Sequence, residues 1–289
     1  MRRKGYVSLT GKGGERRLID LGRFRWVLLA YSALIVSLSI ILPYLVLLQA
    51  AFAKAWARGV SWNNVTVANF HYLLFEHSLV RQSILNTFVY SSAAATIALA
   101  LAISIAYIVN RRLIPFGNVL SILAVAPFVI PGLVLAIGFY AAYAPPPLAL
   151  AGTATILILA FVTRFLPIAY ANASAAIQGI NPEMEDAVTI LGGSRLVAIR
   201  RVVGPLLRRS LIGAWLLVFI PASREVSSAL FLYGPRTRTM SVMFFDLTEG
   251  GNFEHLSALA IILLFTTLIF VMIGLMLVGR DFMLTKVSE

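Results

Sequence analysis

Long apolar runs alternate with shorter polar segments along most of this 289-residue chain. A helix needs about twenty apolar residues to cross a bilayer, and six runs reach or approach that length. They lie at 26–51, 82–109, 120–142, 148–169, 211–233 and 256–278. The pattern predicts an all-α membrane protein with six transmembrane helices.

The third apolar run contains two prolines, Pro127 and Pro131, the second followed by a glycine. Proline removes a backbone hydrogen bond. Within a membrane a broken helix is tolerated only where neighbouring helices or a water-filled cavity satisfy the freed groups. Two interpretations of this break remain open: a packing kink, or a segment that lines a transport pathway.

Charged residues occur inside two predicted spans, Arg164 in the fourth and Arg224 with Glu225 in the fifth. Each costs about 2.5 to 3.5 kcal/mol on insertion scales, so these side chains must face the bundle interior, an aqueous cavity or the interface. We hypothesise that Glu225 pairs with Arg164 across the spans or lines the translocation path. An ion pair with a purely structural role is the alternative.

The longest charged segment between apolar runs is 181–205, and it predicts two short helices joined by a sharp bend. Asn181 suits a helix N-cap, and three acidic residues follow where the helix dipole favours anions: Glu183, Glu185 and Asp186. Gly192 predicts the end of this helix, Ser194 caps the second, and Pro205 interrupts or kinks it. Such a segment cannot lie in hydrocarbon, so it lies against the membrane face or docks to a partner.

The composition agrees with a membrane protein. The chain is 60% hydrophobic and 12% charged, where soluble domains carry about 25% charged residues, and its mean hydropathy is +0.88. A net charge of +12 would indicate nucleic-acid binding in a soluble protein. If the chain has six spans, however, seventeen Lys and Arg residues lie on the side of the termini and five on the other side. This unequal distribution indicates that the positive charge sets the orientation in a membrane rather than binding nucleic acid.

The positive-inside rule places both termini and the 181–205 segment in the cytoplasm. We therefore predict a multi-pass protein of the cell (inner) membrane. A basic cytoplasmic tail at 1–25 is expected to bind anionic lipid headgroups, 52–82 to form an extracytoplasmic loop, and 279–289 to form a cytoplasmic tail. Membrane lipid, and no nucleic acid, is the expected partner of the positive charge.

The sequence predicts no catalytic or metal centre. It has no cysteine, and its histidines, His71, His77 and His255, are scattered, whereas a metal needs converging ligands. The glycine-rich stretch from Thr10 lacks the spacing of a phosphate-binding loop. We expect no enzyme activity and no bound cofactor in this chain.

The 181–205 segment resembles the EAA loop of the ABC importer permeases, which are membrane subunits of the type I fold. The acid, the two small residues, the glycine and the closing proline of that motif correspond to Asp186, Ala187, Val188, Gly192 and Pro205. Asp replaces the usual Glu and Val the second Ala, which keeps an acid followed by small apolar residues. The resemblance implies a permease core over 83–278, with five transmembrane helices and cytoplasmic coupling helices.

The same resemblance implies partners. The loop, including Glu185 and the motif residues, would couple to ABC ATPase subunits, and ATP and Mg would bind those subunits. An extracytoplasmic solute-binding protein would deliver the cargo. A second permease half, homologous or identical, would complete the pathway.

The stretch from Ser223 resembles the last third of ferric-iron-type permeases, and the segment from Thr10 resembles the segment that joins the two halves of such permeases, which are often one fused chain. The resemblance implies that this chain corresponds to the second half, standing alone or as part of a longer product. Ferric iron is therefore the expected cargo, while thiamine, polyamine, sulfate and phosphonate permeases share the pattern and stay open. A secondary transporter, a membrane-embedded enzyme and a membrane assembly scaffold are alternatives of another class. A co-purifying ATPase distinguishes the permease from all three.

Overall fold

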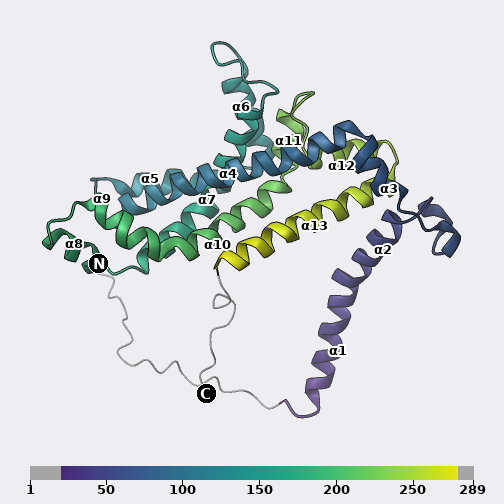
Figure 1. The fold of residues 1–289 in the computed structure, drawn as a ribbon, viewed down its shortest axis with the longest axis horizontal. Helices are drawn as coiled ribbons and strands as arrows, with labels where there is room; N and C mark the ends of the chain where they lie inside the picture. The colour runs from purple at the N-terminus through teal and green to yellow at the C-terminus, as the bar shows by residue number, and fades with distance from the viewer. Residues whose placement is uncertain (1–20, 279–289) are drawn as a thin grey trace. The chain divides into compact units, whose positions relative to one another are not determined.

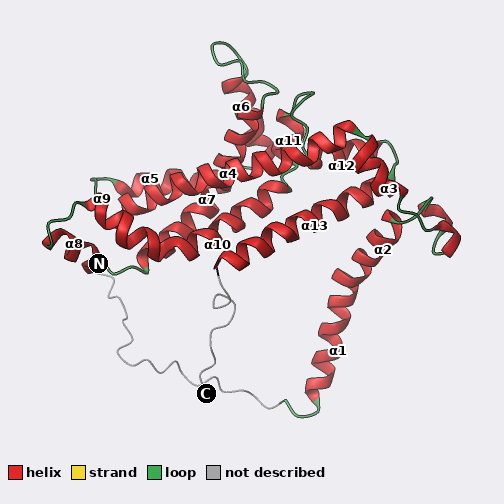
Figure 2. Cartoon of the chain, in the orientation of Figure 1, coloured by secondary structure: helices red, strands yellow, loops and turns green. Residues whose placement is uncertain are grey.

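The computed structural model of the chain describes residues 21–278, and its regular elements in this range are all helices (Figures 1 and 2). The predicted all-α class is confirmed for these residues. Most of the predicted basic tail at 1–25, with the stretch from Thr10, and the predicted tail at 279–289 lie outside the described residues. The chain divides into a unit that ends at Val46 and a unit that begins at Leu47.

The first unit consists, in its described part, mainly of one apolar helix that continues beyond it. α1 (Phe24–Val36), a π-helical turn (Ser37–Ile41) and α2 (Leu42–Ala51) follow one another without a break over 28 residues. This helix begins two residues before the predicted first span, and none of the residues of α1 is buried. A long apolar helix with exposed side chains needs lipid or protein around it.

Four long helices of the second unit run side by side: α4 (Ser78–Asn110), α7 (Ala154–Gln178), α10 (Gly204–Ser223) and α13 (Phe253–Val278) (Figure 1). Each belongs to a segment long and apolar enough to cross a membrane. α4 contributes a row of fully buried alanines to the core that it shares with α7 and α10: Ala94, Ala95, Ala98, Ala102 and Ala106. Small residues let helix backbones approach closely, which explains the close packing of these spans.

The predicted third span, 120–142, is not one straight helix. α5 (Gly117–Val125) and a 3-10 turn (Ala126–Val129) are followed by α6 (Gly132–Tyr143) at an angle of 112°. Ile130 and Pro131, between them, have extended backbones with ψ of 124° and 139°. A residue before proline avoids the helical conformation, so the break falls where the sequence places Pro131. α6 consequently projects away from the parallel helices (Figure 1).

The bent pair carries the chain from one end of the bundle to the other. The end of α4 lies beside the 181–205 segment, because Arg111 forms a 2.7 Å ion pair with Glu185. The start of α7 lies at the other end, where Thr237 Oγ1 donates to the carbonyl of Gly152 at 3.0 Å. The carbonyl of the residue before Thr237 accepts from Gln82, near the start of α4, at 2.9 Å. The bent pair therefore connects the two ends as one broken span would, and with it the described residues contain up to six candidate membrane spans.

We name these ends by their short helices. The α8 end comprises residues 110–117 and 178–195, with α8 at Glu183–Ile190. The α12 end comprises 52–77, 144–153 and 233–252. Its short helices are Trp56–Arg58, Trp62–Asn64, α3 (Ala68–His71), a π turn (Tyr72–Glu76) and α12 (Met240–Glu249). The predicted 52–82 loop is thus partly helical, and its last residues belong to α4.

Two other spans differ from the apolar runs that predicted them. α7 continues to Gln178, well beyond the predicted end at 169, and includes polar residues such as Asn172, whose Nδ2 donates one turn back to the Ile168 carbonyl at 2.8 Å. The predicted fifth span, 211–233, covers parts of two helices that are separate in the structure. α10 ends at Ser223, and α11 (Ser227–Leu232) follows it.

Candidate functional site

The 181–205 segment begins with a capped and acidic helix. Asn181 Oδ1 accepts a 3.1 Å hydrogen bond from the backbone N–H of Glu183, so its side chain caps α8. Glu183, Glu185 and Asp186 all lie in the first turn. Acidic side chains are favoured there because the N-terminus of a helix carries a partial positive charge.

Two glycines end α8 in a Schellman motif. The N–H of Gly192 donates to the Thr189 carbonyl and the N–H of Gly193 to the Val188 carbonyl, both at 2.9 Å. Gly192 has φ of +84°, which favours glycine. A Cβ on Gly193 would lie 2.6 Å from Val188 Cγ1. The two positions therefore need glycine for different reasons, one conformational and one steric.

The second half of the segment is not a separate short helix, which corrects the prediction. Ser194 Oγ does cap it, by accepting from the N–H of Val197 at 3.4 Å. The helix then runs without interruption from Arg195 to Ser223, through α9 (Arg195–Ala198), a π turn (Ile199–Val203) and α10. Pro205 neither ends nor sharply bends it. The wider π turn just before Pro205 relieves the clash that proline makes with a preceding carbonyl in a regular helix.

Apolar side chains are exposed where α8 ends. Ile190 is 85% exposed, Leu191 88% and Leu196 72%. Asp186 and Ala187, on α8, are also exposed, and Val188 is partly buried. This group, the apolar tip, consists of Ile190, Leu191 and Leu196. It gives the segment a surface of the kind that protein partners cover.

Glu185 faces inward, unlike the neighbouring acids. It is only 8% exposed, and its carboxylate accepts from Tyr107 at 2.5 Å and from Arg111 Nε at 2.8 Å. A second guanidinium nitrogen of Arg111 lies 2.7 Å from the same carboxylate. Sequence reasoning missed Tyr107 and Arg111, because their distance along the chain from Glu185 carries no local signal.

The structure brings Arg164 and Glu225 together near the break in the third span. Arg164 Nε lies 3.5 Å from Glu225 Oε2, and another guanidinium nitrogen donates to the Ile130 carbonyl at 3.1 Å. Glu225 Oε1 also accepts from the N–H of Ser228, at the start of α11, at 3.0 Å. Gly132 leaves room for this arrangement, since a Cβ there would lie 3.0 Å from Arg164 Cζ. One arginine therefore connects α7, the break and the start of α11.

The other residues proposed for the pathway are placed differently. Pro127 is buried in the 3-10 turn, and Pro131 is exposed at the start of α6. Arg224 is exposed, and it forms no ion pair with another described residue. It is therefore not part of the Arg164–Glu225 cluster.

No group of three or more His, Asp or Glu side chains within the described range could hold a metal ion. His71 lies 3.0 Å from Glu76 on an exposed surface. His255 packs against Tyr72, with ring centroids 4.8 Å apart.

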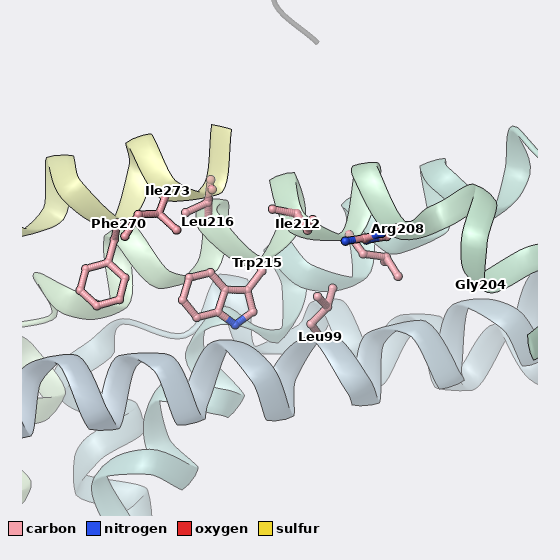
Figure 3. A pocket seen from close by; sticks show the side chains of 10 residues that line it. Leu99, Gly204, Arg208, Ile212, Trp215, Leu216, Phe270 and Ile273 are labelled. Atoms are coloured by element: carbon pink, nitrogen blue, oxygen red, sulfur yellow. The ribbon is translucent and has the colours of Figure 1, made fainter. Parts of the chain in front are cut away.

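A groove of about 530 Å³ lies between α4, α10 and α13 (Figure 3). Its lining is almost wholly apolar and includes Leu99, Trp215 and Phe270, with Arg208 toward the Gly204 side. Trp215 Nε1 donates to Thr96 Oγ1 at 3.1 Å, which satisfies the one polar group of this indole. The groove suits hydrocarbon and offers no polar constellation for chemistry.

No family model matches the chain. The ferric transport system permease protein FbpB of Actinobacillus pleuropneumoniae is 28% identical over 254 residues, which cover 86% of this chain and 36% of that protein. The putative 2-aminoethylphosphonate transport system permease protein PhnV of Salmonella paratyphi A is 26% identical over 231 residues, covering 80% of this chain and 86% of that protein. The chain thus spans about a third of the length of the ferric relative.

A solved structure has the same fold. It is a bacterial alginate ABC transporter in complex with an alginate pentasaccharide-bound periplasmic protein, and one of its chains matches with a TM-score of 0.70. The match covers 89% of this chain and 94% of that chain at 16% identity, so it shows the fold alone. The chain is thus similar in sequence to permease proteins of ferric and 2-aminoethylphosphonate transport systems, and it shares the fold of a chain of an ABC transporter.

Proposed function

We propose that this chain is a transmembrane permease subunit of an ATP-driven importer. It forms a translocation pathway with a second permease half, and its 181–205 segment docks on a separate ATPase subunit that binds ATP and Mg. A solute-binding protein delivers cargo at the α12 end. The chain itself carries no catalytic residue for ATP hydrolysis.

The apolar tip is the observation that carries this proposal. Leu191 is 88% exposed on a charged segment that lies between two membrane spans, α7 and the helix that begins at Arg195. Large apolar side chains that stay in contact with water favour burial against a protein partner. The Schellman motif fixes their position, so the surface is formed before the partner binds.

The distribution of positive charge supports an orientation. Seven arginines lie in the loops of the α8 end and on the first part of the helix that follows: Arg111, Arg112, Arg195, Arg200, Arg201, Arg208 and Arg209. Fewer basic residues lie in and beside the loops of the α12 end: Lys54, Arg58, Arg81, Arg236 and Arg238. The positive-inside rule therefore favours a cytoplasmic α8 end, on the side where ATP is available.

Ferric iron is the proposed cargo, supported by the FbpB relative. The PhnV relative favours 2-aminoethylphosphonate as the second candidate, since the match covers most of that protein. Uptake of each compound by cells that express the complete transporter, with the other as competitor, decides between them.

Single cysteines test the docking directly, because the chain has no cysteine of its own. The probe variant is Leu191→Cys, in the apolar tip. The matched control is Val60→Cys, which is similarly exposed at 87% but lies at the α12 end. Both are expressed with the candidate ATPase and treated with a membrane-impermeant maleimide and with a thiol cross-linker.

We expect Leu191→Cys to react only after the cells are permeabilised, and to cross-link to the ATPase. Val60→Cys should react in intact cells and should form no such cross-link. If Leu191→Cys reacts equally with and without the ATPase, and forms no cross-link, the segment is only a membrane-surface element and the docking proposal is wrong.

A further inference from the structure

Glu185 is withdrawn from the surface that the proposed function assigns to the ATPase. Both of its carboxylate oxygens are occupied, one by the Tyr107 hydroxyl at 2.5 Å and the other by Arg111 at 2.7 and 2.8 Å. Glu185 and Tyr107 are each 8% exposed, and the Arg111 side chain is 11% exposed. Charge-assisted hydrogen bonds of this kind are stronger than neutral ones and fix the geometry of the pair.

The same arginine also holds the chain just after α7. Arg111 donates from its second guanidinium nitrogen to the Ile180 carbonyl at 3.2 Å. The residue before it, Asn110, donates to Ser174 Oγ on α7 at 3.0 Å. The end of α4, the end of α7 and the start of α8 are thus joined by polar contacts at one place.

The second half of the segment is attached to a different span. From Arg195 onward it is one helix with α10, so it must move with that span. α8 is capped by Leu191, and the next helix begins at Arg195. Only three residues lie between them: Gly192, Gly193 and Ser194. A cavity of about 170 Å³ lies between α4, α8 and α9, with Glu185 on one side and Arg195 on another. The two halves also contact each other, and the cavity beside this contact leaves room for a small relative shift.

We infer that Tyr107 and Arg111 are positioning residues for coupling. They make α8 move with α4 and α7, while the half beyond the glycine pair moves with α10. A displacement of the segment by the ATPase then acts on two sets of spans, and the first set includes α7, the helix of Arg164. This inference rests on the proposed function and adds to it the residues that connect the docking surface to the spans.

The test uses the complete transporter in proteoliposomes, with Arg111→Gln as the main variant. Gln keeps a hydrogen-bonding side chain but removes the charge and the paired donors. Tyr107→Phe is a second, milder variant that removes a single hydroxyl and leaves the ion pair. Arg112→Gln is the matched control, since the neighbouring Arg112 is exposed and forms no ion pair with a described residue.

Three quantities are measured: cross-linking of Leu191→Cys to the ATPase, ATP hydrolysis, and cargo transported per ATP hydrolysed. We expect Arg111→Gln to retain cross-linking and basal hydrolysis but to lower transport per ATP by about five-fold or more, the lower range of typical coupling between sites. Tyr107→Phe should have a smaller effect in the same direction, and Arg112→Gln should behave as the native chain.

Two outcomes overturn the inference while the proposed function stands. In one, Arg111→Gln transports as much per ATP as the native chain. In the other, its cross-linking falls in proportion to transport, which shows that the ion pair only shapes the docking surface. Failure of the native chain to cross-link at all is a different result, because it contradicts the proposed function itself.

Discussion

Arg164 joins the elements around the break in the third span. Its guanidinium group contacts the Glu225 carboxylate at 3.5 Å and the Ile130 carbonyl at 3.1 Å. The Glu225 side chain is 10% exposed and that of Arg164 28%. Because the pair is partly withdrawn from water, each charge is stabilised in part by the other, and removal of one should destabilise the protein.

Glu225→Gln tests this pair. Gln still accepts from the N–H of Ser228, so the start of α11 keeps its hydrogen bond, while Arg164 loses its counter-charge. We expect the free energy of unfolding to fall by about 1.5 kcal/mol, the lower end for hydrogen bonds to charged groups, because the contact is long. Thermal unfolding in detergent measures this loss, with the exposed Glu249→Gln as control. Unchanged stability together with unchanged transport would remove both the structural and the pathway interpretation of the pair.

Gly192 is the second residue whose conformation is specific. Its φ of +84° lies in the left-handed region, where a residue with a Cβ is less stable by about 1 to 2 kcal/mol. We expect Gly192→Ala to loosen the end of α8 and to speed tryptic cleavage after Arg195. Gly138→Ala is the control, because nothing lies within 4 Å of a Cβ there and its φ is not positive. Equal cleavage rates for the native chain and Gly192→Ala would contradict the conformational argument.

At the scale of elements, two π turns have the same relation to a proline. The turn Ser37–Ile41 ends two residues before Pro43, and the turn Ile199–Val203 ends two residues before Pro205. A π turn adds one residue to the helix and rotates everything on its N-terminal side relative to the rest. The second turn therefore sets the direction in which α9 faces, with Leu196, its one residue of the apolar tip.

Pro205→Ala tests that role. Alanine supplies the missing N–H and removes the clash, so the π turn can relax to a regular helix and rotate α9 relative to α10. We expect a chain at least as stable as the native one, but with weaker cross-linking from Leu196→Cys, on α9, to the ATPase. If cross-linking and stimulated hydrolysis both stay at the native level, the π turn does not orient the docking surface.

For the whole molecule, the apolar pattern predicted the candidate spans, of which the described residues contain five or, with the bent pair, six, but it did not predict their shape. Sequence alone indicated six spans and the break at Pro131, since proline restricts the residue before it. The 112° bend could not be predicted, because a proline marks where a helix breaks but not the angle between its parts, and the contact of Arg164 with the Ile130 carbonyl at the break has no local signal. Likewise, α7 and the helix from Arg195 extend beyond their apolar runs, since helix continuity does not require apolar side chains.

The 181–205 segment was predictable to a similar degree. Asn181, Ser194 and Gly192 act as the local capping rules predicted. The predicted role of Pro205 was wrong because the π turn accommodates it. In the sequence, Glu185 is one of three acids at the start of a helix, and only the fold shows that Tyr107 and Arg111 enclose it.

The crossing by the bent pair gives a prediction about topology. Phe116, before α5, is 85% exposed, and Leu148, after α6, is 53% exposed. If the pair crosses the membrane, Leu148→Cys should react with an impermeant maleimide in intact cells, as Val60→Cys does, and Phe116→Cys should not. Labelling of both positions from the same side would show that this pair enters and leaves the membrane on one face.

ATP hydrolysis by the chain reconstituted with its candidate ATPase and binding protein tests the importer function most directly, with Gly192→Pro as the comparison. We expect cargo-loaded binding protein to stimulate hydrolysis with the native chain. Gly192→Pro, whose proline cannot adopt the positive φ of this position, should lose the stimulation or fail to assemble. If the native chain neither binds the ATPase nor responds to the binding protein, the chain is not a permease of an ATP-driven importer.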